Sequence, residues 1–249
     1  MLEPYDFYEG RVFRPPSEAY SLIVQSTIGC SHNGCRFCEM YREKRFRIRP
    51  LEDVLNDLRR ARGFTAQAAR IFFADGDAFI RRADEQAELL RQTRRIFPEC
   101  ERISMYASPG SILIKSDEEL CALCAAGAEL LYLGLESGDD ALLQAVNKGA
   151  TAEEIITAAK RAAAAGFQLS VTAISGLAGA EGSMAHAEAT AEAVSAMKPA
   201  YFSLLTLMLE PGSEMYEDYR AGRFAPLSAR AILEETRRFL ERVDSEGTV

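Results

Sequence analysis

Short runs of β-branched and aromatic residues alternate along this chain with segments of helical periodicity, and this alternation restricts the fold more than any other feature. The runs expected to form strands are Leu22–Thr27, Arg70–Ala74, Arg102–Ala107, Leu130–Leu135, Leu169–Ile174 and Tyr201–Leu207. Strands separated by helices of this length form βαβ units around a parallel sheet. The sequence therefore predicts an α/β fold, and this number of units suggests a parallel sheet curved into a partial barrel.

The segments between the predicted strands carry helix signals. Two capping boxes, Ser116–Glu119 and Thr151–Glu154, predict helices that end near Gly127 and Gly166. The periodicity predicts further helices over Leu51–Arg62, Asp84–Ile96, Met184–Met197 and Ser228–Val243.

Length and charge restrict the class of protein. The 249 residues can bury a full core as one domain, so we expect a single domain over residues 1–249, with its core at about 20–220 and a short C-terminal helix at 228–243. A formal net charge of −8 argues against a nucleic-acid partner. The longest apolar run, Leu204–Leu209, is too short to span a bilayer. Met1–Pro4 shows no signal segment, so we expect a reducing, cytoplasmic location.

Three cysteines with C-x4-C-x2-C spacing follow the first predicted strand: Cys30, Cys35 and Cys38. Three thiolates on one short loop suit an iron–sulfur cluster, which cysteine sulfur holds. If no fourth protein ligand arrives, one iron of a [4Fe–4S] cluster is open to a small molecule. Such a cluster would be a site of reaction and not only an electron relay.

Zinc is the main alternative for this loop. Cys35 and Cys38 form a zinc-like knuckle, to which Cys30 or His32 could add a ligand, but a structural zinc site usually needs a second knuckle. Cys121-x2-Cys124 is the only other candidate pair. A disulfide is disfavoured because we expect a reducing compartment.

The remaining cysteines and the second histidine have simpler interpretations. Cys121 and Cys124 lie in an apolar helical stretch and are expected to be buried thiols, as is Cys100. His186 is expected on a helix surface. With two histidines in the chain, an acid–base site built on paired histidines is excluded.

The cysteine loop resembles the cluster loop of radical S-adenosylmethionine (radical SAM) enzymes. The usual family spacing is C-x3-C-x2-C, and the pair Asn33-Gly34 can absorb the extra residue because both tolerate positive φ. Phe37 matches the aromatic residue that the family places before its last cysteine. The resemblance covers roughly residues 20–220 and implies a (β/α)6 partial TIM barrel. It also implies a [4Fe–4S] cluster on the three loop cysteines and SAM as a second cofactor.

Turns after the predicted strands carry the rest of this resemblance. Asp75-Gly76-Asp77 stands where the family has a Gly-Gly-Glu-like turn for the methionine amino group, and a carboxylate suits an ammonium. An ordinary acidic turn is the alternative. Ser108, in the turn after the third strand, could line the same site.

The fourth and fifth strands add further expected SAM contacts. Gly134–Gly138 resembles a Gly-Leu-Glu-Ser-Gly segment in which the Glu and Ser contact the ribose or methionine of SAM, here Glu136 and Ser137. Lys148 could face the methionine carboxylate or, equally, satisfy a helix C-terminus. Gly176 and Leu177, in a glycine-rich turn, would pack the adenine.

A basic stretch directly follows the cysteine loop. It could attract an anionic substrate, but a solvated segment is the favoured interpretation. Its basic residues are Arg42, Lys44, Arg45, Arg47 and Arg49.

The resemblance implies an enzyme that reductively cleaves SAM at a [4Fe–4S] cluster, generating a 5′-deoxyadenosyl radical that acts on a substrate the sequence does not identify. It also implies an electron donor of the flavodoxin or ferredoxin type. We expect a monomer or weak oligomer with no membrane partner, and no catalytic residue is identified. The alternatives are an iron–sulfur electron-transfer or sensing protein without SAM chemistry, and a zinc-stabilised binding module. The family often carries more barrel lid beyond the last helix, which leaves open a truncated C-terminus.

Overall fold

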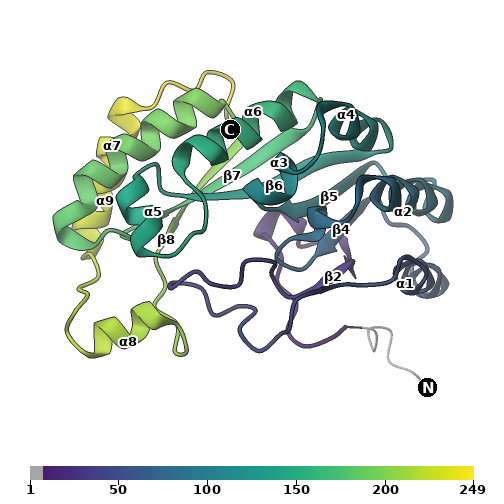
Figure 1. Ribbon diagram of the computed structural model, residues 1–249, viewed down its shortest axis with the longest axis horizontal. Coiled ribbons are helices and arrows are strands. Elements are labelled where there is room, and N and C mark those ends of the chain that lie inside the picture. The colour runs from purple at the N-terminus through teal and green to yellow at the C-terminus, as the bar shows by residue number, and fades with distance from the viewer. Residues whose placement is uncertain (1–7) are drawn as a thin grey trace. The chain divides into compact units, whose positions relative to one another are not determined.

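The computed structural model describes residues 8–249 and contains an open six-stranded sheet with alternating helices (Figure 1). The strand order is β1-β4-β5-β6-β7-β8, and β1–β4, β4–β5 and β7–β8 pair in parallel. This confirms the predicted parallel α/β fold. Met1–Pro4, on which the expected location depends, lies outside the described residues. The six strands are β1 Leu22–Gln25, β4 Arg70–Ala74, β5 Arg102–Ala107, β6 Ala128–Glu136, β7 Gln168–Ser175 and β8 Tyr201–Thr206.

The longer helices lie where periodicity and capping boxes predicted them. They are α1 Leu51–Phe64, α2 Ala83–Ile96, α4 Asp117–Ala125, α6 Ala152–Ala164, α7 Gly179–Met197 and α9 Ala229–Arg242. Both predicted capping boxes form, since Ser116 and Glu119, and likewise Thr151 and Glu154, exchange side-chain-to-backbone hydrogen bonds.

The short elements were not predicted. They are helices α3 Pro109–Leu113, α5 Asp140–Ala145 and α8 Glu214–Arg220, the 3-10 turns η1 Pro16–Glu18 and η2 Ala78–Ile80, and the antiparallel pair of β2 Thr27–Ile28 with β3 Arg47–Ile48. Each is too short for periodicity to reveal.

The chain divides into two compact units. Unit 1 comprises the residues up to 33, together with 40–132 and 161–168; unit 2 comprises 34–39, 133–160 and 169–249. The expectation of a single domain stays a prediction. The cysteine loop and strand β6 each contribute residues to both units.

Unit 1 has an aromatic core, and the side chain of Glu18, near the start of the chain, is hydrogen-bonded beside it. Phe72 contacts the rings of Tyr106 and Tyr132 edge-on, with centroids 5.0 and 5.8 Å apart. Glu18 of η1 is fully buried and accepts hydrogen bonds from Arg102 (2.8 Å) and from the Tyr132 hydroxyl (2.6 Å). Burial raises the pKa of Tyr132, and the bond to Glu18 adds to the shift. Glu18 therefore ties the N-terminal segment to β5 and β6.

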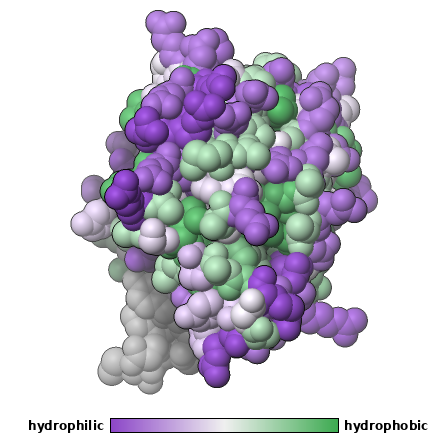
Figure 2. Space-filling model, turned by 90° about the vertical axis from the view of Figure 1, so that its left-hand side faces the viewer, coloured by the Kyte–Doolittle hydropathy of each residue, from purple (hydrophilic) through white to green (hydrophobic). Residues whose placement is uncertain are grey.

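Unit 2 is built around α7 and α9, which lie side by side (Figure 1). Phe239 of α9 stacks on Phe202 of β8, with ring centroids 5.0 Å apart. Leu233 and Leu240 of α9 are exposed. Figure 2, which looks from the side of Figure 1 where α9 is drawn, shows hydrophobic surface between hydrophilic side chains.

Candidate functional site

The thiols of the cysteine loop, Cys30, Cys35 and Cys38, are partly exposed and form no disulfide. Asn33 has φ 45°, as predicted for the residue that absorbs the longer spacing, whereas Gly34 does not have positive φ. Among the residues that the structure describes, no three Cys, His, Asp or Glu side chains are grouped as metal ligands.

The second half of the loop is fixed by backbone contacts within unit 2. The Arg36 N–H donates to the Val146 carbonyl (2.9 Å), and the Arg36 carbonyl accepts from the Met215 N–H (3.1 Å). The Asn147 amide donates to the Gly34 carbonyl at 2.8 Å. The segment that carries Cys35 and Cys38 is therefore held by the end of α5 and the start of α8, a role that sequence reasoning did not assign.

In unit 1, the turn after β4 packs closely against the loop at Cys30. A Cβ on Gly76 would lie 2.7 Å from the Cβ of Cys30, which is closer than real Cβ atoms come. The Gly76 N–H donates to the Gly29 carbonyl at 3.1 Å. Glycine is therefore required at this position so that the turn can approach the first cysteine.

Asp75 is fully buried, and hydrogen bonds engage both of its carboxylate oxygens. It accepts from the Gly29 N–H (2.8 Å), from the Lys44 ammonium (2.8 Å) and from the Gln25 amide (3.2 Å). Lys44 is 7% exposed. The interpretation of the basic stretch as solvated is therefore wrong for Lys44, because its charge compensates a carboxylate that has no access to water.

The other members of the basic stretch divide between the interior and the surface. Arg49 is also poorly described as solvated, because its side chain is 15% exposed and pairs with the buried Asp57 at 2.6 Å. Arg47 pairs with Glu9 at the surface. Arg42 and Arg45 are exposed, as the solvated interpretation expected.

Asp77 is fully buried and joins the cysteine loop to the turn after β5. It accepts hydrogen bonds from the hydroxyls of Ser31 (2.5 Å) and Ser108 (2.8 Å), and from the Ser108 N–H (3.1 Å). Lys115 lies nearby and donates to the Phe79 and Ser111 carbonyls. Burial lowers the pKa of Lys115 to about 8, although the charge of Asp77 opposes the shift. Unit 1 therefore links Asp75, Gly76, Asp77 and Ser108 to the start of the cysteine loop, through Gly29, Cys30 and Ser31.

Glu136 ends β6 in an unusual backbone conformation. Its φ is 62°, in the left-handed region that residues with a side chain rarely adopt. The Lys148 ammonium contacts its carboxylate at 2.8 Å, and a Cβ on Gly134 would lie 2.1 Å from a Glu136 carboxylate oxygen. Lys148 thus forms an ion pair with Glu136, a predicted site residue. Gly134 has no side chain, so the ion pair can occupy the space next to it.

Ser137 contacts His186 inside unit 2. The Ser137 hydroxyl lies 2.8 Å from Nδ1 of His186, and Nε2 of His186 lies 3.1 Å from the Ile174 carbonyl. A carbonyl can only accept, so Nε2 of His186 carries the ring proton and donates to the Ile174 carbonyl. Nδ1 of the neutral ring then accepts a hydrogen bond from the Ser137 hydroxyl. His186 is 1% exposed, and burial lowers its pKa. The expectation of a surface histidine is therefore wrong, because α7 turns this residue toward the β6 and β7 ends.

The turn after β7 contains the two residues predicted to pack the adenine. Gly176 has φ 81°, and Leu177 is 1% exposed in a cluster with Val146, Met215 and the partly buried Phe37. The Ser175 hydroxyl is buried without a partner among the described residues. Unit 2 therefore brings Phe37 and Leu177 together and leaves an unsatisfied polar atom in the same turn.

The remaining cysteines divide between surface and core. Cys121 is exposed and Cys124 is partly exposed, so the prediction of two buried thiols is wrong. Leu120 and Leu123, both fully buried, occupy the inner face of α4. Cys100 is buried, as predicted, and burial raises its pKa.

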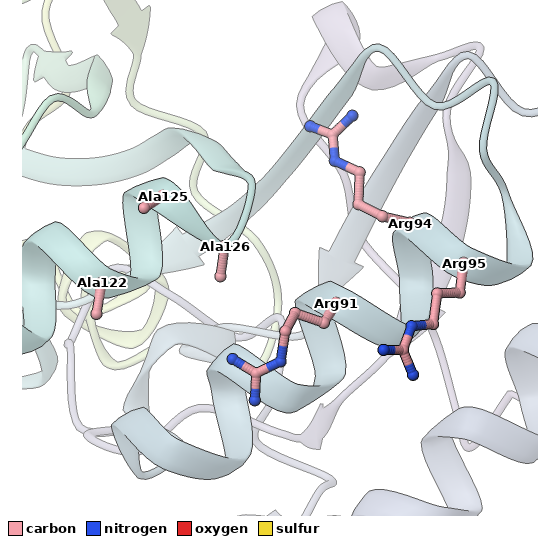
Figure 3. Close-up of a pocket in the computed structure, with 6 residues that line it drawn as sticks. All are labelled: Arg91, Arg94, Arg95, Ala122, Ala125 and Ala126. Atoms are coloured by element: carbon pink, nitrogen blue, oxygen red, sulfur yellow. The ribbon is translucent and has the colours of Figure 1, made fainter.

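A shallow hollow of about 500 Å³ lies between α2 and α4. Figure 3 shows Arg91, Arg94 and Arg95 of α2 opposite small alanine side chains of α4. None of the predicted site residues lines this hollow. No helix in the described part of the chain combines the length and apolarity needed to cross a bilayer.

Comparison with known proteins assigns the family. Residues 24–194 match the family model of the Radical SAM superfamily, so the chain belongs to this superfamily of enzymes. Radical SAM enzymes use a [4Fe–4S] cluster and SAM. No curated protein sequence matches the chain.

Solved structures share the fold at low sequence identity. Methylornithine synthase is 13% identical with a TM-score of 0.62, and the match covers 90% of this chain and 63% of that protein. Coproporphyrinogen III oxidase from Escherichia coli is 19% identical with a TM-score of 0.64 over 89% of this chain and 52% of that protein. The methyltransferase TsrM from Kitasatospora setae, solved with cobalamin and a [4Fe–4S] cluster, is 20% identical with a TM-score of 0.62. The match covers 84% of this chain and 42% of that protein. The chain thus spans less than two thirds of the length of each.

Proposed function

We propose that this chain reductively cleaves SAM at a [4Fe–4S] cluster held by Cys30, Cys35 and Cys38. When bound, the cluster supplies the electron that breaks the C5′–S bond of SAM and yields a 5′-deoxyadenosyl radical. Superfamily membership over residues 24–194 carries the proposal. The donor set supports it, because three accessible thiols without disulfide partners suit an iron–sulfur cluster.

The turn at residues 75–77 would shape the part of the site nearest the cluster. Hydrogen bonds within unit 1 already occupy both buried carboxylates, so their role is to fix the turn beside Cys30. Lys44 balances the charge of Asp75, whereas the hydrogen-bond partners of Asp77 are neutral hydroxyl and N–H groups. The Asp77 carboxylate would therefore favour the ammonium group of the methionine part of SAM. Gly76 lets this turn approach the cluster loop.

Residues of unit 2 would bind the rest of SAM. Glu136, with Lys148 as its counter-ion, offers a carboxylate oxygen to the ribose hydroxyls, and Ser137 holds the strand end in place. Leu177 and Phe37 supply apolar cover for the adenine, and the unpaired Ser175 hydroxyl supplies a hydrogen-bonding group. An electron donor of the flavodoxin or ferredoxin type would reduce the cluster.

Anaerobic reconstitution with iron and sulfide tests this function. With dithionite and SAM, the wild-type protein should release 5′-deoxyadenosine, measured by mass spectrometry. Cys30→Ala, Cys35→Ala and Cys38→Ala should each lose iron and this activity, whereas Cys121→Ala and Cys124→Ala should retain both.

Two results would reject the proposal and support the alternatives. A stable cluster that neither binds nor cleaves SAM would indicate an electron-transfer or sensing protein. Zinc in place of iron in anaerobically purified protein would indicate a zinc-stabilised module.

A further inference from the structure

Glu235 of α9 is a buried carboxylate on a helix whose other charged side chains are exposed or partly exposed. Glu234 pairs with Arg230 and Glu241 with Arg237 at the surface, whereas Glu235 is 2% exposed. Among the described residues, no cation forms an ion pair with it. Burying a carboxylate without a counter-ion is costly, so the hydrogen bonds that it accepts must compensate for the lost water.

Glu235 has two hydrogen-bond partners. Gly176 lies in the turn between β7 and α7, and Ser183 lies near the start of α7. One carboxylate oxygen accepts the Gly176 N–H at 2.8 Å, and the other accepts the Ser183 hydroxyl at 2.5 Å. Gly176 has a left-handed backbone conformation, with φ 81°. Glu235 therefore fixes the point at which β7 turns into α7.

Packing by the same helix reinforces this contact. A Cβ on Gly176 would lie 3.0 Å from Cδ1 of Ile232, which precedes Glu235 by about one helical turn and lies on the same side of α9. Leu177, directly after Gly176, packs against Val146 and Met215. A displacement of Gly176 would thus move the apolar side chain that is proposed to cover the adenine.

We infer that Glu235 is a positioning residue for the SAM-binding turn, so that the C-terminal helix α9 is part of the cofactor site rather than only a cover for α7. This inference rests on the proposed function, because it assigns the turn at Gly176 and Leu177 to the adenine. Glu235 acts through the Gly176 N–H and does not contact SAM.

Glu235→Leu and Glu235→Gln separate this role from general stability. Leucine has a similar volume but leaves the Gly176 N–H and the Ser183 hydroxyl without an acceptor. We expect about tenfold weaker SAM binding for Glu235→Leu, measured from the change that SAM causes in the EPR signal of the reduced cluster. Glutamine keeps one carbonyl acceptor and should bind SAM nearly as the wild type does. Iron content should be unchanged in both variants.

Two controls lie on the same helix. Glu234→Leu makes the same change one residue earlier, at the surface, and should leave SAM binding unchanged. Phe239→Leu disturbs the stack on Phe202 without touching the turn, so it should lower Tm but preserve SAM affinity. Equal weakening of SAM binding in Phe239→Leu and Glu235→Leu would overturn the inference, as would wild-type affinity in Glu235→Leu. If Glu235→Leu does not fold, Glu235→Asp, whose shorter side chain withdraws the carboxylate, should bind SAM more weakly than Glu235→Gln.

Hydrogen exchange distinguishes a failure of this inference from a failure of the proposed function. The amides of residues 175–179 should exchange faster in Glu235→Leu than in the wild type, without SAM present. Faster exchange in a protein whose wild type never binds SAM would reject the proposed function and leave Glu235 as the residue that orders this turn. Unchanged exchange would reject the positioning role itself.

Discussion

The acidic turn after β4 carries two fully buried carboxylates, Asp75 and Asp77. Its hydrogen-bond partners come from positions far away in the sequence, at Gln25, Gly29 and Lys44 for Asp75. No local pattern separates the buried Lys44 from the exposed Arg42 and Arg45, because all three stand in one basic run.

Glu136 is the carboxylate that pairs with Lys148 at the end of β6, and its proposed contact with SAM can be tested by substitution. Glu136→Ala removes the acceptor offered to the ribose and leaves the Lys148 charge without its partner. We expect SAM binding to weaken by about 1–3 kcal/mol, the usual cost of losing a hydrogen bond to a charged group. The EPR response of the reduced cluster to added SAM measures this affinity, and the iron content should stay unchanged. Equal SAM affinity in the variant and the wild type would remove Glu136 from the site.

Lys115 gives a pH dependence whose direction can be worked out. Its pKa is about 8 in the folded protein, against an ordinary value of 10.5. Between these values the unfolded chain binds more protons than the folded one, so the contribution of Lys115 to the free energy of unfolding rises with pH. Below pH 8 this contribution is constant.

Urea unfolding of the wild type and of Lys115→Met, from about pH 7 to about pH 10, isolates this contribution because the other titrating groups are common to both proteins. The stability of the wild type should increase relative to the variant as the pH rises above 8. A difference that does not change with pH would show that Lys115 keeps its ordinary pKa.

At the scale of elements, the alternation of apolar runs and helical periods was sufficient to locate the sheet strands and the long helices. β4 and β5 have the predicted bounds, and β6 and β7 extend the predicted runs at both ends. The short helices α3, α5 and α8 were missed, although α5 and α8 fix the Cys35–Cys38 half of the loop. Such helices depend on tertiary contacts rather than on their own propensity.

The capping box of α4 can be tested on its own. Ser116→Ala removes the side-chain acceptor of the Glu119 N–H and should lower the free energy of unfolding by about 1 kcal/mol. Cys121→Ala, at an exposed position of the same helix, should change it by less than about 0.5 kcal/mol. Chemical denaturation of both variants measures the two values. An equal loss in both would show that the cap does not stabilise α4.

At the scale of the whole molecule, the site residues are dispersed through the sequence and the parallel topology relates them. Asp75, Ser108, Glu136 and Gly176 each stand at or directly after the carboxyl end of a strand, as the alternation predicted. The sequence could not show that hydrogen bonds within the protein already engage Asp75 and Asp77, nor that His186 and Glu235 support the turns from α7 and α9. Those contacts arise from the packing of helices against strand ends, which no local spacing encodes.

If SAM binds the folded protein, it should stabilise that protein against unfolding. A ligand present at about 100 times its Kd stabilises the folded state by about 2.7 kcal/mol. SAM should therefore raise the Tm of the cluster-loaded protein under anaerobic conditions. The same concentration should have a much smaller effect on Cys38→Ala, which lacks a cluster to hold SAM. An equal rise in both proteins would show that SAM binds elsewhere.

The anchoring of Glu18 has a consequence for limited digestion by proteases. Cleavage before Pro16 would leave η1 in place, and the remaining fragment would keep the carboxylate that Arg102 and Tyr132 require. Cleavage after Glu18 would remove that carboxylate and leave a buried tyrosine hydroxyl and an arginine without their acceptor. The shortest fragment to survive digestion should therefore begin before Glu18, and any shorter fragment should be degraded rapidly.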